Sequence, residues 1–191
     1  MFNAPTLLSD RIWAPDPANR LVRGLILSVA GSIFIAACAR IQVPMWPVPV
    51  TMLTFAVLLV SLVYGPRLAL ATVSLYLAQG ILGLPVFAAG GGIAYLMGPT
   101  GGYLLACLPA AFVAGVLAQR GWGTQAGRVF LAMLVGSFIF YLVGASWLAS
   151  FVGPEKAIAA GVLPFLIGDA LKAMLAAALL PAAWSLLPRD A

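Results

Sequence analysis

Long apolar stretches, separated by single arginines and by connections rich in glycine or proline, make up the pattern of this chain. A membrane-spanning helix requires about 20 mostly apolar residues. We expect such helices over residues 21–39, 51–64, 68–84, 103–119, 129–151 and 163–187, with boundaries uncertain by several residues. The second segment is short and reaches across a bilayer only if the connection before it enters the membrane. The pattern predicts an all-α bundle of six transmembrane helices.

Composition supports an integral membrane protein. The chain has 191 residues, of which 63% are hydrophobic and 8% are charged, whereas a soluble domain carries about 25% charged residues. No polar block is large enough to form a second domain. We therefore expect one membrane domain over residues 1–191, with residues 1–20 as a cytoplasmic N-terminal segment and the bundle over about 21–187.

The distribution of basic residues predicts the orientation of the bundle. Cytoplasmic connections of membrane proteins carry an excess of lysine and arginine. With both termini inside, seven arginines are cytoplasmic, and only Arg40 and Lys156 lie in outer connections; the seven are Arg11, Arg20, Arg23, Arg67, Arg120, Arg128 and Arg189. The sequence thus predicts a multi-pass protein with N-in and C-in topology. The net charge of +5 is scattered along the chain, which excludes a nucleic-acid partner, because such a partner requires clustered basic residues.

Both unusual connections then fall on the outer side. The proline-rich loop, QVPMWPVPV (42–50), cannot form a regular helix, because its prolines lack backbone donors. The glycine-rich loop, PVFAAGGGIAYLMGPTGG (85–102), allows close approach of backbone. Irregular apolar loops at membrane depth are tolerated where they cover a cavity, so we expect both to cap a ligand cavity. The alternative is that they are ordinary connections with interfacial Trp and Tyr anchors.

Two charges lie inside the last apolar segment. Asp169 and Lys172 are three residues apart and project from similar faces of a helix, although each charge costs at least ~2.5–3.5 kcal/mol in mid-bilayer. A neutralising ion pair is one interpretation, but apolar residues would usually be as stable. Intramembrane charges are therefore a hypothesis for function.

The chemistry open to this pair is restricted. The chain has no histidine, no GxxxxGK[ST] nucleotide-binding motif, and only Glu155 and Asp169 as acids between residues 17 and 189. Cys38 and Cys107 lie in apolar runs and are expected to be buried thiols. We therefore predict no catalytic residues and no metal site. What remains is recognition of a ligand with N–H donors, an acceptor or anionic group, and a hydrocarbon body.

Small residues recur every four positions on the first helix: Gly24, Ser28, Ser32 and Ala36. We call this set the small-residue stripe. Such stripes let another membrane helix approach closely. The stripe fits either a partner protein or another helix of this chain.

Four stretches, taken together and in this order, resemble the BioY family, the biotin-specific substrate-binding subunits of energy-coupling-factor transporters. They are ARIQVPMWPVPVTM, GLPVF followed by GGG, GPTGGY, and PFLIGDALKA, and the resemblance runs from about Arg20 to the last helix. It implies a six-helix bundle in a bacterial inner membrane that binds biotin from outside, without a cofactor, for uptake. It also implies a transmembrane coupling protein and two cytoplasmic ATPases as partners, with the small-residue stripe resembling the face that contacts the coupling protein.

The resemblance also implies a binding site. Asp169 is expected to accept hydrogen bonds from the ureido N–H groups. Lys172 is expected to donate a hydrogen bond to the ureido carbonyl or to the valerate carboxylate. Arg40 competes for the carboxylate, unless it is an interfacial anchor. Aromatic packing on the rings is expected from Tyr103, Trp46 and Tyr95, unless they belong to the interfacial belt. Some members place an asparagine in the glycine-rich loop, where this chain has three glycines. The polar contact is then expected either from a backbone group of the loop, at Gly91, or from elsewhere in the chain.

Three other functions stay open at this point. The chain could bind another vitamin as a subunit of the same class. It could be a small membrane enzyme that uses Asp169 and Lys172, which would require a nucleophile and a base held together. It could be a structural subunit, which leaves the two charges unexplained.

Overall fold

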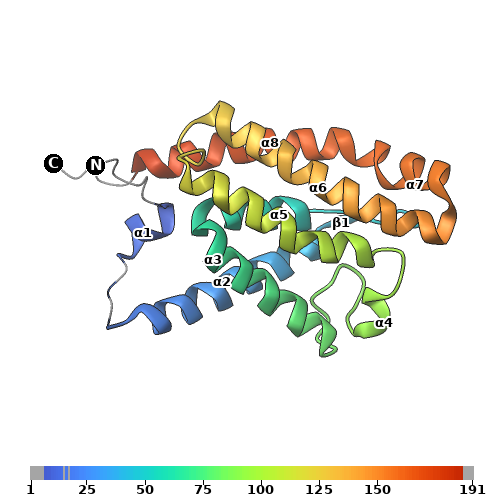
Figure 1. Cartoon of the computed structure of the whole chain (residues 1–191), viewed down its shortest axis with the longest axis horizontal. Helices are drawn as coiled ribbons and strands as arrows, with labels where there is room; N and C mark the ends of the chain where they lie inside the picture. The colour runs from blue at the N-terminus through green and yellow to red at the C-terminus, as the bar shows by residue number, and fades with distance from the viewer. Residues whose placement is uncertain (1–6, 15, 17, 187–191) are drawn as a thin grey trace.

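The protein is mostly helical in the computed structural model, which describes residues 7–14, 16 and 18–186 (Figure 1). Its elements, in chain order, are α1 (Leu8–Ile12), α2 (Arg20–Arg40), β1 (Gln42–Val43), β2 (Val50–Thr51), α3 (Leu53–Ile81), α4 (Ile93–Leu96), α5 (Gly101–Gln119), α6 (Ala126–Val152), α7 (Pro154–Gly161) and α8 (Leu163–Leu186). Within the described residues, five stretches are long and apolar enough to cross a membrane: Arg20–Arg40, Leu53–Ile81, Gly101–Gln119, Ala126–Val152 and Pro154–Leu186. These stretches confirm the prediction of a mostly helical protein with several apolar helices long enough to cross a membrane.

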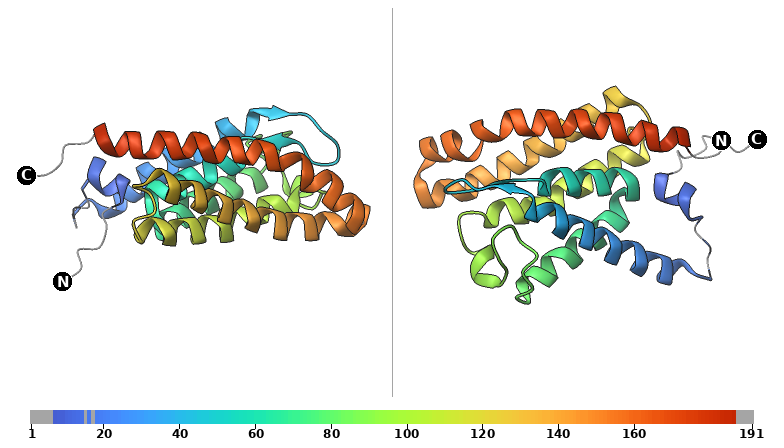
Figure 2. Two further views of the ribbon diagram at one scale, coloured as in Figure 1. Left: turned by 90° about the horizontal axis from the view of Figure 1, so that it is seen from above. Right: turned by 180° about the vertical axis from the view of Figure 1, so that it is seen from behind.

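Helix α3 is interrupted at its middle by Gly65. This residue has φ 74° and ψ 174°, a conformation that is open essentially to glycine alone. Pro66 follows directly and starts the next helical part, where its missing N–H has no intrahelical partner to lose. Figures 1 and 2 show α3 folding back on itself as a V. Its two arms correspond to the predicted segments 51–64 and 68–84.

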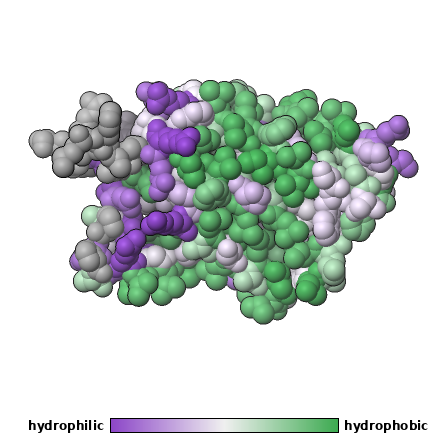
Figure 3. Space-filling model, viewed as in Figure 1, coloured by the Kyte–Doolittle hydropathy of each residue, from purple (hydrophilic) through white to green (hydrophobic). Residues whose placement is uncertain are grey.

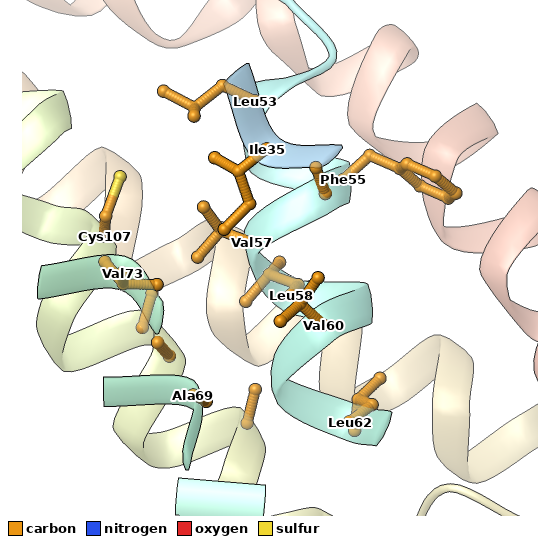
Figure 4. Close-up of a cluster of buried hydrophobic side chains, with 14 of the residues drawn as sticks. Ile35, Leu53, Phe55, Val57, Leu58, Val60, Leu62, Ala69, Val73 and Cys107 are labelled. Atoms are coloured by element: carbon orange, nitrogen blue, oxygen red, sulfur yellow. The ribbon is translucent and has the colours of Figure 1, made fainter. Parts of the chain in front are cut away.

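The core lies around α3, which packs on α2 and α5, while α6 packs on α5 and α8. Ile35, Val57, Leu58 and Val73 are fully buried there (Figure 4). The helices approach closely at glycines, as where a Cβ on Gly136 of α6 would lie 2.2 Å from the side chain of Leu58. Both cysteines are buried and free, as predicted. These contacts fix the relative positions of α3, α6 and α8.

Apolar residues cover the middle of the molecule on the face shown in Figure 3, between two more polar ends. The polar residues on this face gather mainly at the end that carries α1. Large apolar side chains such as Leu25, Phe138 and Ile167 are exposed by 67%, 64% and 76%. Apolar surface on this scale is the expected outer face of a protein whose solvent is lipid.

The N-terminal helix α1, which sequence analysis did not predict, packs against the end of the bundle. Arg23 of α2 binds Asp10 of α1 with an N–O distance of 2.6 Å. The guanidinium of Arg11 lies 6.0 Å from the ring centre of Trp184 in α8. Helix α1 and the end of α8 are thus at the same end of the molecule. Arg189 lies outside the described residues.

The two irregular loops lie at the opposite end (Figures 1 and 2). The proline-rich loop contains no helix, as predicted, but its ends pair as antiparallel strands, with Gln42 opposite Thr51 and Val43 opposite Val50. The glycine-rich loop is anchored by Phe87, which is fully buried, and it contains the short helix α4. Sequence analysis did not predict this hairpin, helix α4 or helix α7.

Candidate functional site

The two charged residues of α8 form a buried ion pair. Lys172 Nζ lies 2.7 Å from Asp169 Oδ1. Asp169 is 3% and Lys172 is 7% exposed. At this degree of burial each charge requires the other, because an unpaired ion would lose its hydration without compensation. The neutralising ion pair, which was one interpretation of the spacing, is therefore present.

Two hydroxyl groups from other helices complete this network. Tyr141 of α6 donates to Asp169 Oδ2 at 2.5 Å. Thr54 of α3 accepts a hydrogen bond from Lys172 Nζ at 3.0 Å and donates to Asp169 Oδ1 at 3.3 Å. We call Asp169, Lys172, Thr54 and Tyr141 the polar network. It joins three helices, and sequence analysis missed both of its hydroxyls.

An apolar cavity of about 50 Å³ lies beside the polar network. Its wall is formed by Val48, Pro49, Thr51, Leu53, Thr54, Ala88, Tyr95, Thr100, Tyr103, Leu104, Phe140, Tyr141 and Phe165. Thr54 and Tyr141 belong to this wall, whereas Asp169 and Lys172 are not among the described residues that line it. The ion pair therefore faces the cavity through the two hydroxyls.

A larger hollow of about 480 Å³ lies outside this cavity. It is bounded by the proline-rich loop on one side and by the glycine-rich loop on the other, and it shares Pro49, Tyr95 and Thr100 with the cavity. Sites for drug-sized ligands measure about 300–1,000 Å³. The inner cavity is smaller than this, whereas the outer hollow falls within the range. A ligand of that size therefore reaches the polar network only if the two spaces join, and Pro49, Tyr95 and Thr100 lie at the boundary that they share.

Two of the predicted aromatic residues line the cavity. Tyr103 of α5 stacks on Phe165 with ring centres 6.0 Å apart, and its hydroxyl donates to the carbonyl of Gly161 at 2.7 Å. Tyr95 stacks on Phe87 at 5.5 Å. Both rings are thus held by packing. Tyr95 borders both the cavity and the outer hollow, whereas Tyr103 borders the cavity.

Other predicted site residues lie away from the cavity wall. Trp46 is 84% exposed and borders a separate hollow with Lys156. Arg40 is exposed, and its guanidinium donates to the carbonyl of Pro85 at 2.5 Å. A Cβ on Gly91 would lie 2.2 Å from the carbonyl oxygen of Leu84, so loop packing alone accounts for a glycine there. None of these three is among the described residues that line the cavity.

The small-residue stripe is divided between the interior and the surface. Ser28 is 7% and Ser32 is 0% exposed, and Ser32 accepts from Gln79 of α3 at 3.4 Å. Gly24 and Ala36 are half-buried, and a Cβ on Gly24 would meet nothing within 4 Å. The middle of the stripe therefore packs within this chain.

The site offers hydrogen-bonding groups but no metal-binding cluster among the described residues. One carboxylate, one ammonium and two hydroxyls adjoin an apolar, aromatic cavity. This arrangement can orient a small ligand that has an apolar body and a few polar groups.

Comparisons with known proteins agree with this description. A probable biotin transporter BioY from Pyrococcus horikoshii is 45% identical over 137 residues, which cover 71% of this chain and 80% of that protein. The biotin transporter BioY from Thermotoga maritima is 36% identical over 162 residues, 82% of this chain and 92% of that one. Both are named as transporters.

A solved structure and a family model extend the similarity over almost the whole chain. The crystal structure of the S-component for biotin from an ECF-type ABC transporter has a TM-score of 0.77 at 27% identity, and the match covers 89% of this chain and 95% of that one. The model of the BioY family matches residues 9–189. The chain belongs to the BioY family.

Proposed function

We propose that this chain captures biotin from outside a cell membrane as the substrate-binding subunit of an energy-coupling-factor transporter. The observation that carries the proposal is the buried polar network beside an apolar cavity, under two loops at one end of the bundle. Family membership and the similarity to the S-component for biotin support it. The same findings favour biotin over another vitamin, and transport over catalysis.

Biotin has the groups that this site complements. Its ureido ring carries two N–H donors and a carbonyl acceptor, its sulfur ring is apolar, and its valerate is anionic. Asp169 supplies the negative charge that favours N–H donors, either directly or through a hydroxyl. Lys172 has two partners among the described residues, so its ammonium keeps one N–H for the ureido carbonyl or the carboxylate.

The membrane arrangement in this proposal has six passes. The fold-back at Gly65 adds one crossing to the five candidate spans, which agrees with α1 and the end of α8 lying at one end. By the positive-inside rule that end is cytoplasmic, and the loops and cavity face outward. We propose a bacterial inner membrane as the location.

The proposed partners are a transmembrane coupling protein and two cytoplasmic ATPases. The name of the structural neighbour, an S-component of an ECF-type ABC transporter, supports this assembly. Within the small-residue stripe, Gly24 and Ala36 keep part of their surface open to such a partner. Transport then draws its energy from the ATPases, and this chain supplies ligand recognition.

Calorimetric titration of the purified chain with biotin tests the proposal. We expect tight binding by the wild type, and a loss of about 30- to 4,000-fold in affinity for Asp169→Asn, because the buried partners of the carboxylate are then mismatched (~2–5 kcal/mol). The matched control is Glu155→Gln, which removes an exposed acid at the start of α7 and should leave the affinity unchanged. Absence of biotin binding by a folded wild type overturns the proposal, and other vitamins are then titrated.

A further inference from the structure

The hydroxyl of Tyr141 stands between the buried carboxylate and the cavity. Tyr141 lines the cavity, whereas Asp169 is not among the described residues that do. The single hydrogen of the hydroxyl is donated to Asp169 Oδ2 at 2.5 Å. Since a phenol has one donor and two lone pairs, the oxygen of Tyr141 has only acceptor capacity left for a ligand in the cavity.

We propose that the phenolic oxygen of Tyr141 accepts one ureido N–H of the ligand, and that Asp169 acts on this N–H through Tyr141. The inference rests on the proposed function and deepens it. Donation to a carboxylate leaves the phenolic oxygen more electron-rich, because linked hydrogen bonds polarise one another. The carboxylate also fixes the direction of the hydroxyl, so that a ligand group that could only accept meets no donor there.

Thr54 has a different role in the same network. Its oxygen already accepts from Lys172 at 3.0 Å, while its hydrogen is directed to Asp169 Oδ1 at 3.3 Å. One of its two lone pairs is therefore occupied. The third N–H of Lys172 is the donor that remains in this network, but Lys172 is not among the described residues that line the cavity. The hydroxyl oxygens of Tyr141 and Thr54 are therefore the groups that the network presents to a ligand there.

A cycle of protein variants and ligand analogues tests the contact. The ligands are biotin and its two lactam analogues, in each of which one ureido N–H is replaced by CH₂. With the wild type, we expect one of the two lactams to bind about 10- to 100-fold more weakly than biotin, because it leaves the oxygen of Tyr141 unpaired. With Tyr141→Phe, that same lactam should bind within about threefold of biotin, because the acceptor is absent.

Thr54→Val is the matched control in this cycle. It also removes a hydroxyl that donates to Asp169, but it should weaken all three ligands by the same factor and keep the discrimination between biotin and the lactam. Thermal unfolding of each variant without ligand verifies that it is folded. If Tyr141→Phe does not fold, Tyr141→Met replaces it in the same cycle.

Each outcome decides the inference. Loss of discrimination in the Tyr141 variant, with discrimination retained in Thr54→Val, supports it. An equal loss for all ligands in the Tyr141 variant overturns it, since Tyr141 would then act only by holding Asp169. Loss of discrimination in Thr54→Val instead makes Thr54 the acceptor and also overturns it. Absence of biotin binding by the wild type overturns the proposed function itself, which the other results leave intact.

Discussion

Lys172 neutralises a carboxylate that has almost no access to solvent. Removing one member of such a pair leaves an uncompensated buried charge, whereas removing both leaves none. We expect Lys172→Met to destabilise the ligand-free protein by about 3–5 kcal/mol. The double variant Asp169→Leu with Lys172→Met should recover most of this loss and still fail to bind biotin. Thermal unfolding in detergent measures both effects. A double variant as unstable as the single one would show that the pair itself stabilises the fold.

Two of the four residues of the polar network could be predicted from the sequence. Asp169 and Lys172 are conspicuous because a charge is rare within an apolar helix. Thr54 and Tyr141 are neutral, are common in membrane helices, and lie 115 and 28 residues from Asp169. Their role depends on which faces of α3 and α6 turn toward α8, and those faces are set by packing. A single hydroxyl in an apolar run carries no comparable signal.

Gly65 is the residue at which α3 folds back on itself. Its φ and ψ cost a residue with a Cβ about 1–3 kcal/mol. We therefore expect Gly65→Ala to lower the free energy of unfolding by about this amount. Gly24→Ala is the control, because Gly24 is helical and a Cβ there meets nothing within 4 Å; it should be stabilising by about 0.5–1 kcal/mol. Equal unfolding temperatures for the two variants would contradict this role of Gly65.

Long elements were predictable from the sequence and short ones were not. An apolar run indicates a spanning helix whatever it packs against, so the long helices fall close to their predicted ranges. The helices α1 and α7 have 5 and 8 residues, too few for a periodic pattern, and the hairpin depends on pairing across the proline-rich loop. The small-residue stripe predicted a close contact with another helix. Residue size alone does not indicate whether that helix belongs to this chain or to a partner protein. Ser32 is at the contact with α3.

Within the described residues, most of the arginines lie at the end of the molecule opposite the cavity. The end with α1 carries the Asp10–Arg23 pair and the contact of Arg11 with Trp184, and exposed arginines follow at the fold-back of α3 and at the end of α5, at Arg67 and Arg120. The cavity and its loops occupy the other end. If the arginine-rich end is cytoplasmic, ligand reaches the cavity from outside, and the proposed ATPases would act at the other face.

Labelling of single cysteines from one side of the membrane tests this orientation. Cys38 and Cys107 are first replaced by alanine, and a cysteine is then placed at Lys156 on α7 or at Thr124 between α5 and α6, both of which are exposed. In intact cells, an impermeant maleimide should label Lys156→Cys, and it should label Thr124→Cys only after the membrane is permeabilised. The reverse pattern would place the cavity on the cytoplasmic side. Such a cavity could not capture biotin from outside, so the same two variants test both the topology and the direction of uptake.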